Sequence, residues 1–79
     1  MDTHRLIKMA NDIGAFFEAE PDRAVALEGV ASHIRRFWEP RMRRELLRWV
    51  DERNGEGLKE VVLAAIQGNR EKLTPQTAA

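Results

Sequence analysis

The stretch that decides the fold is HIRRFWEPRMRRELLRW, residues 33–49. In its middle, Trp38-Glu39-Pro40 separates two patterns of helical spacing. The residue before a proline is pushed away from helical dihedral angles, so one helix is expected to end near Glu39. Proline suits the first turn of a helix, where its missing N–H would be unpaired anyway, so Pro40 is expected to begin the next helix. The sequence therefore predicts a corner between two helices at Glu39.

Outward from this corner, apolar residues recur at spacings of three and four, which is typical of amphipathic helices. No strand-like alternation of Val, Ile or Thr appears. The predicted helices cover about residues 3–19, 21–37, 40–53 and 56–67. The expected signals at their ends are Thr3 as the first N-cap, Pro21 in the first turn of the second helix and Asn54-Gly55 as the stop of the third. The predicted fold is all-α, a small bundle of about four short helices.

The apolar stripe of each helix is expected to face the core of this bundle. The stripes of the first two helices are Leu6, Met9, Ala10, Ile13, Phe16 and Phe17, then Ala24, Leu27, Val30, Ala31, Ile34 and Phe37. Gly14 stands inside the first pattern, where it costs about 1 kcal/mol relative to alanine. Because a residue without a side chain lets another helix approach closely, we expect a close helix contact at Gly14.

Length and composition indicate one domain. The chain has 79 residues and no cysteine, so neither disulfides nor thiolate metal sites can stabilise it. A chain this short buries only about 60 % of its unfolded surface, so its core is thin and contacts with a partner would add to it. Residues 1–68 are expected to form a single helical domain. Residues 69–79 have little to bury and are expected to form a flexible C-terminal tail.

Neither a membrane span nor a signal peptide is indicated. The longest run without a charged residue is VVLAAIQGN, residues 61–69, whereas a spanning helix needs roughly 20 apolar residues. The N-terminal segment, residues 1–14, lacks the apolar region of a signal peptide. The absence of cysteine fits a reducing compartment. We therefore expect a soluble, cytoplasmic protein.

The residue types needed for catalysis or metal binding are scarce. The chain has one serine, Ser32, and two histidines, His4 and His33. Ser32 and His33 are neighbours on one helix, so their side chains diverge and do not form a nucleophile with its base. Ligands on one helix face must lie three or four residues apart, and no residue at those distances from His33 is a metal ligand. We expect neither a catalytic site nor a metal site.

The positive charge of this chain is concentrated in the opening stretch. Six arginines lie between His33 and Trp49 against two glutamates, although the net charge of the whole chain is zero. Arginine presents a planar fork of donors that suits interface ion pairs, whereas lysine suits a solvated surface. Three interpretations stay open at this point: a protein interface, a nucleic-acid interface, and ion pairs with the acids of the chain itself.

The residue types around the corner favour a protein interface. Phe37, Trp38, Arg41 and Met42 combine four types that are enriched at interface hot spots. A nucleic-acid module would place arginines on phosphates and stack aromatics on bases, but DNA-binding domains usually carry a strong basic excess, which this neutral chain lacks. In an ordinary helical domain the arginines would pair internally, yet few acids lie near them in sequence.

Two stretches of the chain resemble a known family. KMANDIGAFF, residues 8–17, and ASHIRRFWEPRMR, residues 31–43, are similar to the delta subunit of bacterial NAD-dependent, molybdenum-containing formate dehydrogenases. The matching positions are Met9-Ala10-Asn11, Phe16-Phe17, His33, Phe37, Trp38, Pro40, Arg41 and Met42. Met9 stands where the family usually has a branched aliphatic residue. The resemblance covers about residues 6–66, and Phe-Trp-x-Pro-Arg-Met is its most specific motif.

The resemblance implies a small non-catalytic subunit that docks on the catalytic alpha subunit and, through it, joins the beta and gamma subunits. In the family, the alpha subunit carries bis-molybdopterin guanine dinucleotide and iron–sulfur clusters and oxidises formate to carbon dioxide. The beta subunit holds FMN and passes electrons to NAD. The implied role of the delta subunit is to support complex stability or molybdenum-cofactor assembly. The present chain is expected to bind no cofactor by itself.

The docking surface implied by the resemblance is the corner between the second and third predicted helices. Trp38 and Met42 are expected to enter an apolar depression of the partner, while the arginines meet acidic groups, carbonyls or phosphates. The residues expected to bind the partner are His33, Arg35, Arg36, Phe37, Trp38, Pro40, Arg41, Met42, Arg43 and Arg44. In the free chain, the same surface is a candidate for self-association.

Overall fold

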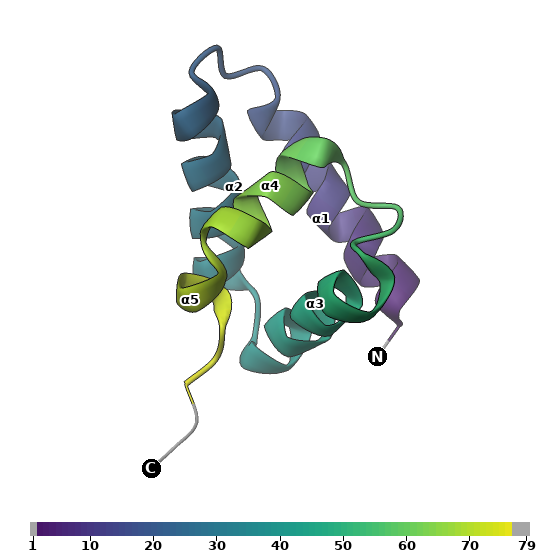
Figure 1. Cartoon of the computed structure of the whole chain (residues 1–79). Helices are drawn as coiled ribbons and strands as arrows, with labels where there is room; N and C mark the ends of the chain where they lie inside the picture. Colours follow the sequence, from purple (N-terminus) through teal and green to yellow (C-terminus); the bar gives the residue numbers. More distant parts are fainter. Residues whose placement is uncertain (1, 77–79) are drawn as a thin grey trace.

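The computed structural model describes residues 2–76 and, within that range, contains helices and no strands. The helices are α1 (Thr3–Phe17), α2 (Arg23–Phe37), α3 (Pro40–Arg53), α4 (Glu60–Gly68) and α5 (Arg70–Leu73). Figure 1 shows α4 crossing in front of α1 and α2, with α3 below α4 and against the beginning of α1. The prediction of a small all-α bundle is confirmed, with a short fifth helix added. None of the described helices is long and apolar enough to cross a membrane.

The core lies where the first four helices converge, and α5 closes one side of it. The largest fully buried side chains are Ile34, Leu46, Ile66, Leu73, Val30 and Val62. Burying each of these side chains contributes about 1.5–3 kcal/mol, which makes this cluster the main source of stability. The predicted stripes supply much of the core, but Phe16, Ala24 and Phe37 are exposed rather than buried.

The N-cap of the first helix is not the predicted residue. Asp2 is the N-cap of α1, and its carboxylate accepts a hydrogen bond from the backbone N–H of His4 at 3.0 Å. Aspartate is a strong cap because its oxygen satisfies a free N–H of the first turn. The prediction of Thr3 as the cap is wrong. The Thr3 hydroxyl instead donates to Glu45 of α3 at 2.9 Å, which ties the start of α1 to α3.

The second helix starts with the same kind of cap. Asp22 accepts hydrogen bonds from the backbone N–H groups of Ala24, at 3.0 Å, and Val25, at 3.4 Å. The helix therefore begins at Arg23 rather than at Pro21, because the cap itself must stay outside the helix. The predicted start was two residues early, and Pro21 lies in the connection between α1 and α2.

The predicted corner is confirmed. Trp38 and Glu39 adopt extended backbone conformations, and Pro40 is the first residue of α3. At the other end of α3, Asn54 takes a left-handed conformation with φ 56°, which confirms the predicted stop. Both boundaries follow from local backbone preferences, which explains why the sequence alone locates them.

The start of α4 differs from its prediction. The helix begins at Glu60, not near Glu56, because Gly55 and Gly57 take left-handed conformations with φ values of 69° and 87°. The side chain of Asn11 holds this connection. Its amide donates to the carbonyl of Gly57 at 2.9 Å and its oxygen accepts from the N–H of Lys59 at 2.8 Å. A contact between residues so distant in sequence leaves no local signal.

The close helix contact predicted at Gly14 is confirmed. An added Cβ at Gly14 would lie 2.5 Å from Cγ2 of Val62 and 3.2 Å from Cγ1 of Val61. Real Cβ atoms do not tolerate the shorter distance, so the missing side chain is what allows α4 to pack on α1.

The packed domain extends beyond residue 68, the boundary predicted from the sequence. Residues 70–73, which were assigned to a flexible tail, form α5, and Leu73 is 1 % exposed. Arg70 pairs with Asp51 of α3 at 2.6 Å and adds a contact from the start of α5. The sequence underestimated this segment because a single buried leucine stabilises it, and one residue makes no periodic pattern. The last part of the predicted tail, residues 77–79, lies outside the described residues.

Candidate functional site

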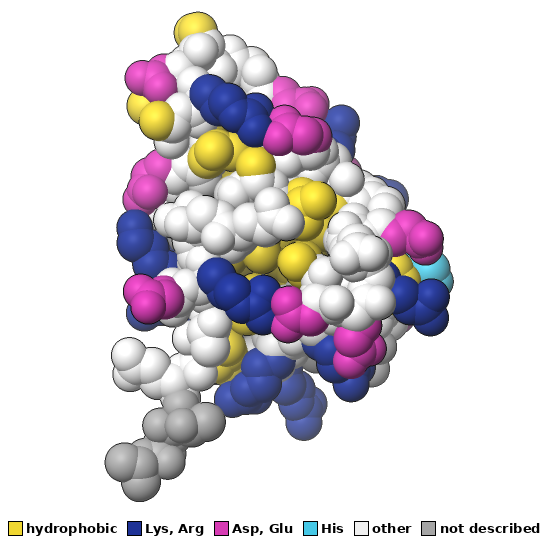
Figure 2. Space-filling view, viewed as in Figure 1, with side chains coloured by type: hydrophobic (Ala, Val, Ile, Leu, Met, Phe, Trp, Pro, Cys, Tyr) yellow, Lys and Arg dark blue, Asp and Glu magenta, His cyan; other side chains and the backbone are white. Residues whose placement is uncertain are grey.

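The end of α2 and the beginning of α3 bring five arginines to one edge of the molecule. We call this group the arginine corner: Arg35, Arg36, Arg41, Arg43 and Arg44. Figure 2 shows Lys and Arg side chains, in dark blue, grouped at the lower edge of the molecule, where Figure 1 places the connection between α2 and α3. The fold therefore concentrates the positive charge of the segment instead of dispersing it.

The arginine corner is not neutralised from within the described chain. None of its five side chains forms an ion pair with a carboxylate of residues 2–76. Other arginines are paired, such as Arg23 with Glu60. Arg48, the sixth arginine of the segment, pairs with Glu45 at 2.6 Å. The prediction that the chain lacks acids close enough for all six arginines is therefore confirmed for five of them.

Arg43 differs from the rest of the corner because it is buried. Only 8 % of it is exposed, and no described group accepts a hydrogen bond from its buried Nε. Burial lowers the pKa of Arg43, and the positive charges of Arg35 and Arg44 lower it further. A guanidinium whose Nε is buried without an acceptor, and which lies beside like charges, is costly to the free chain, so a bound anion would relieve it.

The two aromatic residues at the corner differ in exposure, although the sequence placed both on the docking surface. Trp38 is 5 % exposed and belongs to the core, so it does not present its ring to a partner, contrary to the docking hypothesis. Phe37, which the sequence placed both in the apolar stripe of the second predicted helix and among the partner-binding residues, is 68 % exposed. The reason is that α2 ends at Phe37, and the extended backbone of Trp38, with φ −89° and ψ 133°, turns the next side chain inward.

Phe37 forms part of an exposed aromatic cluster. The His33 ring lies 4.8 Å from its ring, and the Arg36 guanidinium carbon lies 5.8 Å from the ring centre. At that distance a guanidinium is attracted to an aromatic face. The cluster therefore joins the apolar surface of Phe37 directly to the positive charge of the arginine corner.

His33 also lines a groove between α1 and α2. This aromatic groove has a volume of about 440 Å³ and is formed by Asp12, Ile13, Phe16, Phe17 and His33. The rings of Phe16 and Phe17 stand edge to face with centres 5.0 Å apart. Phe16 is 75 % exposed. An exposed phenylalanine beside an apolar groove is a common feature of interaction surfaces.

The sequence missed Phe16 as a surface residue. Its spacing fits the apolar stripe of α1, which predicted burial, but α1 ends at Phe17 and no helix of the described chain covers Phe16. The sequence held no signal for this exposure. Adjacent residues on a helix point in directions about 100° apart, but one apolar face can bury both, as it does for Leu46 and Leu47 of α3.

The remaining predicted site residues divide between surface and interior. Pro40, Arg41 and Arg44 are exposed, and His33 is half-buried. Met42 is half-buried and packs against the core, so it offers only part of its side chain to a partner. The structure thus brings together an aromatic groove, Phe37 and the arginine corner, and it removes Trp38 from the predicted surface. Within residues 2–76, no three His, Asp or Glu side chains are placed to hold a metal ion together.

Comparison with known proteins bears on the family of the chain. Residues 5–66, more than half of the sequence, match the model of the family described as NADH-dependent formate dehydrogenase delta subunit, FdsD. No curated protein and no solved structure gives a significant match. The matched range contains α2, α3 and most of α1 and α4, and it includes both the aromatic groove and the arginine corner. The chain belongs to the delta-subunit family of NADH-dependent formate dehydrogenases.

Proposed function

We propose that this chain is a non-catalytic subunit that docks on the catalytic alpha subunit of an NADH-dependent formate dehydrogenase and stabilises the assembled complex. Membership of the delta-subunit family supports association with such a complex. The observation that carries the proposal is that the exposed aromatic rings join the arginine corner, whose side chains form no ion pair with residues 2–76. Their occupant would be an apolar segment of the alpha subunit flanked by acidic residues.

The apolar half of the proposed interface consists of Phe16, Phe37 and the groove between α1 and α2. Phe16 and Phe37 are 75 % and 68 % exposed, so most of their surface remains available for burial. Covering a phenylalanine completely contributes about 1.5–3 kcal/mol, and aromatic residues commonly form the energetic centre of an interface. This half would supply most of the affinity.

The charged half would supply orientation and speed of association. Five arginines without carboxylate partners in residues 2–76 create a positive field at one edge of the chain. A matching acidic surface accelerates the encounter, and ion pairs at a rim affect binding rate and salt dependence more than affinity. Bidentate arginine–carboxylate pairs would also fix the rotational position of the chain on its partner.

Co-purification with the alpha subunit tests this proposal. Tagged alpha subunit is co-expressed with the chain, and the complex is measured by native mass spectrometry at moderate salt. Phe37→Ala is expected to reduce the bound fraction strongly, because the ring is exposed and its loss leaves the core intact. Val25→Ala is the matched control, since Val25 is 50 % exposed on the same helix but outside the aromatic groove. Equal retention of Phe37→Ala and wild type would contradict the proposed surface.

The same experiment separates a resident subunit from an assembly factor. Retention of the chain on alpha subunit loaded with its cofactor would support the resident subunit proposed here. Preference for cofactor-free alpha subunit would favour a role in molybdenum-cofactor assembly. If the chain does not bind the alpha subunit but binds nucleic acid with a steep salt dependence, the arginines would serve phosphate contacts and the proposal would fail.

A further inference from the structure

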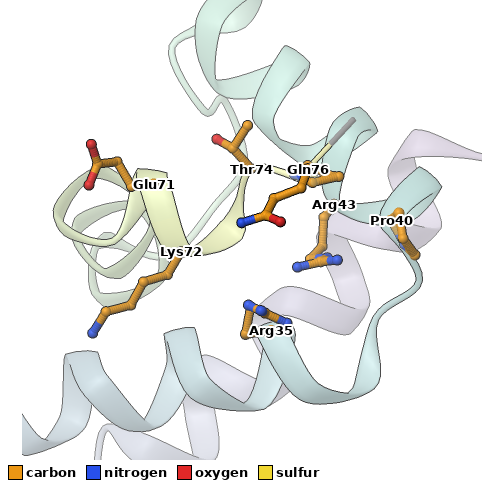
Figure 3. Close-up of a pocket in the computed structure, with 8 residues that line it drawn as sticks. Arg35, Pro40, Arg43, Glu71, Lys72, Thr74 and Gln76 are labelled. Carbon is orange, nitrogen blue, oxygen red and sulfur yellow. The ribbon is translucent and has the colours of Figure 1, made fainter. Parts of the chain in front are cut away.

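A polar pocket lies between the end of α2, the start of α3 and α5, and it shares no residue with the aromatic groove. Its volume is about 360 Å³. The hydrogen-bonding side chains that line it include Arg35, Arg43, Lys72, Thr74 and Gln76. Figure 3 shows the guanidinium groups of Arg35 and Arg43 close together, with the Gln76 amide beside them. The pocket thus gathers several donors around one space.

Arg43 gives the first reason to expect a ligand there. It is 92 % buried, since its exposure is 8 %, and its Nε has no hydrogen-bond acceptor among residues 2–76. In Figure 3 its guanidinium is directed into the pocket toward Arg35. Buried polar groups in native proteins nearly always have partners, so an unpaired buried donor calls for an acceptor from outside the chain.

The charge balance of the pocket gives the second reason. Lys72 has a carboxylate near it, because its Nζ lies 3.8 Å from Glu28. Glu71 lines the pocket, but Figure 3 shows its carboxylate pointing away from the two guanidinium groups. Arg35 and Arg43 form no ion pair with residues 2–76. Two positive charges therefore remain without compensation.

The beginning of α3 adds to the positive potential. Its first turn contains no acidic residue, and the N-cap Glu39 makes no side-chain capping hydrogen bond. A helix carries a partial positive charge at its N-terminus and favours anions there. Placing Arg41 and Arg43 in this turn works against the helix dipole unless an anion is bound nearby.

We propose that this pocket binds a phosphate group, held between the guanidinium groups of Arg35 and Arg43. Phosphate fits better than a single carboxylate because its charge near neutral pH, about −1.5 to −2, matches the two uncompensated arginines. Arginine also donates bidentate hydrogen bonds to phosphate oxygens. Thr74 and Gln76 offer further donors at the pocket wall. The group comes either from free phosphate or from a phosphoryl group of a larger small molecule.

Isothermal titration of the full-length chain tests this proposal, with inorganic phosphate and pyrophosphate as probes at constant ionic strength set by chloride. Arg43→Met and Arg35→Met are each expected to weaken phosphate binding about tenfold or more, the loss typical of a charge-assisted hydrogen bond. Arg44→Met removes the same charge from the same helix but outside the pocket, and it should change affinity less than about twofold.

The variants keep the test decisive. Methionine retains most of the length of arginine, and replacing a buried charge by an apolar side chain usually preserves folding. Should circular dichroism show that Arg43→Met is unfolded, Arg35→Met decides, because Arg35 is exposed. Phosphate should also shift the NMR signal of the Arg43 Nε–H in the wild-type chain. Tighter binding of pyrophosphate would identify a phosphoryl group of a larger molecule as the source, and equal binding would identify free phosphate.

Three results would overturn the proposal. These are no binding by the wild-type chain, an equal loss in Arg44→Met, and an unperturbed Arg43 Nε–H signal at saturating phosphate. A fourth result is that Arg43→Met loses co-purification with the alpha subunit while the wild-type chain binds no phosphate. This result would indicate that the pocket binds a carboxylate of the partner. Because the titration needs no partner, its outcome is independent of the docking proposal.

Discussion

The two ends of α2 carry similar numbers of charges but satisfy them differently. At the N-terminal end, Asp22 caps the helix and Arg23 pairs with Glu60 of α4. Nearby, Lys59 pairs with Glu18 at 3.3 Å. At the C-terminal end, Arg35 and Arg36 join the three arginines of α3, and none of the five pairs with a carboxylate of residues 2–76. The charges at the N-terminal end of α2 are thus paired within the described chain, and those at the C-terminal end are not.

This difference indicates which end is available for binding. Exposed ion pairs contribute little to stability, with a median of about 0–1 kcal/mol, so the N-terminal end gains mainly order from its pairs. The C-terminal end instead holds like charges together and buries Arg43 among them. An arrangement that destabilises the free chain is expected where binding recovers the loss, as mass action stabilises whatever state the ligand prefers.

The largest effect is expected for Trp38, the buried aromatic residue of the corner. Trp38→Ala should lower the free energy of unfolding by about 3–5 kcal/mol, because it leaves a large cavity in the core. Phe37→Ala should change it by less than about 0.5 kcal/mol, since the ring is mostly exposed. Urea unfolding followed by far-UV circular dichroism measures both. Similar losses for the two variants would mean that the outer side of the corner is also structural, which would remove the contrast.

The next largest effect is expected where α4 packs tightly on α1. Gly14→Ala should destabilise the fold by about 1–3 kcal/mol, the range for overpacking, because its Cβ would meet Val62 of α4. Gly68 provides the control, since an added Cβ there meets nothing within 4 Å. Gly68→Ala should therefore be neutral or stabilise by up to about 1 kcal/mol, as alanine is the better helix former. Thermal unfolding distinguishes the two, and a stable Gly14→Ala variant would show that α4 is free to move away from α1.

A smaller effect is expected from the helix caps. Asp22→Ala should cost about 1 kcal/mol, because Asp22 accepts two backbone hydrogen bonds at the start of α2. Asp22→Asn keeps the acceptor oxygen and should restore most of this loss. Glu39→Ala should change stability by less than about 0.5 kcal/mol, since Glu39 makes no capping hydrogen bond with its side chain. If Glu39→Ala were as costly as Asp22→Ala, the start of α3 would not be free for an anion.

The features that the sequence predicted are those set by local backbone chemistry. Pro40 forbids continuation of α2 and starts α3, and Asn54 tolerates the left-handed conformation that ends it. The spacing of apolar residues identified the four main helices, and the Phe-Trp-x-Pro-Arg-Met motif identified the family that the comparison confirmed. Each of these signals lies within a few residues of the feature it predicts.

The features that the sequence missed depend on where elements end and what packs over them. Phe37 is exposed and Trp38 is buried because α2 ends between them. The residue at which the helix ends therefore decides which of the two rings enters the core. Phe16 fits the stripe of α1 but has no helix above it. Leu73 is buried only because α5 meets α2 and α4, which no local pattern reveals. That five arginines find no carboxylate among the described residues was predictable, because it required only a scarcity of nearby acids.

The smallest effect concerns Glu45, which marks the limit of the arginine corner. The hydrogen bond from Arg48 and, after it, the one from the Thr3 hydroxyl lower the pKa of Glu45 below its ordinary value of 4.5. Because the pKa is lower in the folded chain, Glu45 stabilises the fold at pH values above the unfolded pKa. This stabilisation is lost as the pH falls through the folded pKa.

Glu45→Gln should therefore flatten the decline of the free energy of unfolding at acidic pH, measured by urea titrations below about pH 5, where a carboxyl of ordinary pKa begins to protonate. Glu56→Gln is the control, since Glu56 is exposed and its side chain forms no ion pair with residues 2–76. The same flattening in both variants would mean that the contact with Arg48 does not stabilise the fold. Arg48 would then behave as a sixth uncompensated arginine, and the surface open to a partner would extend one further turn along α3.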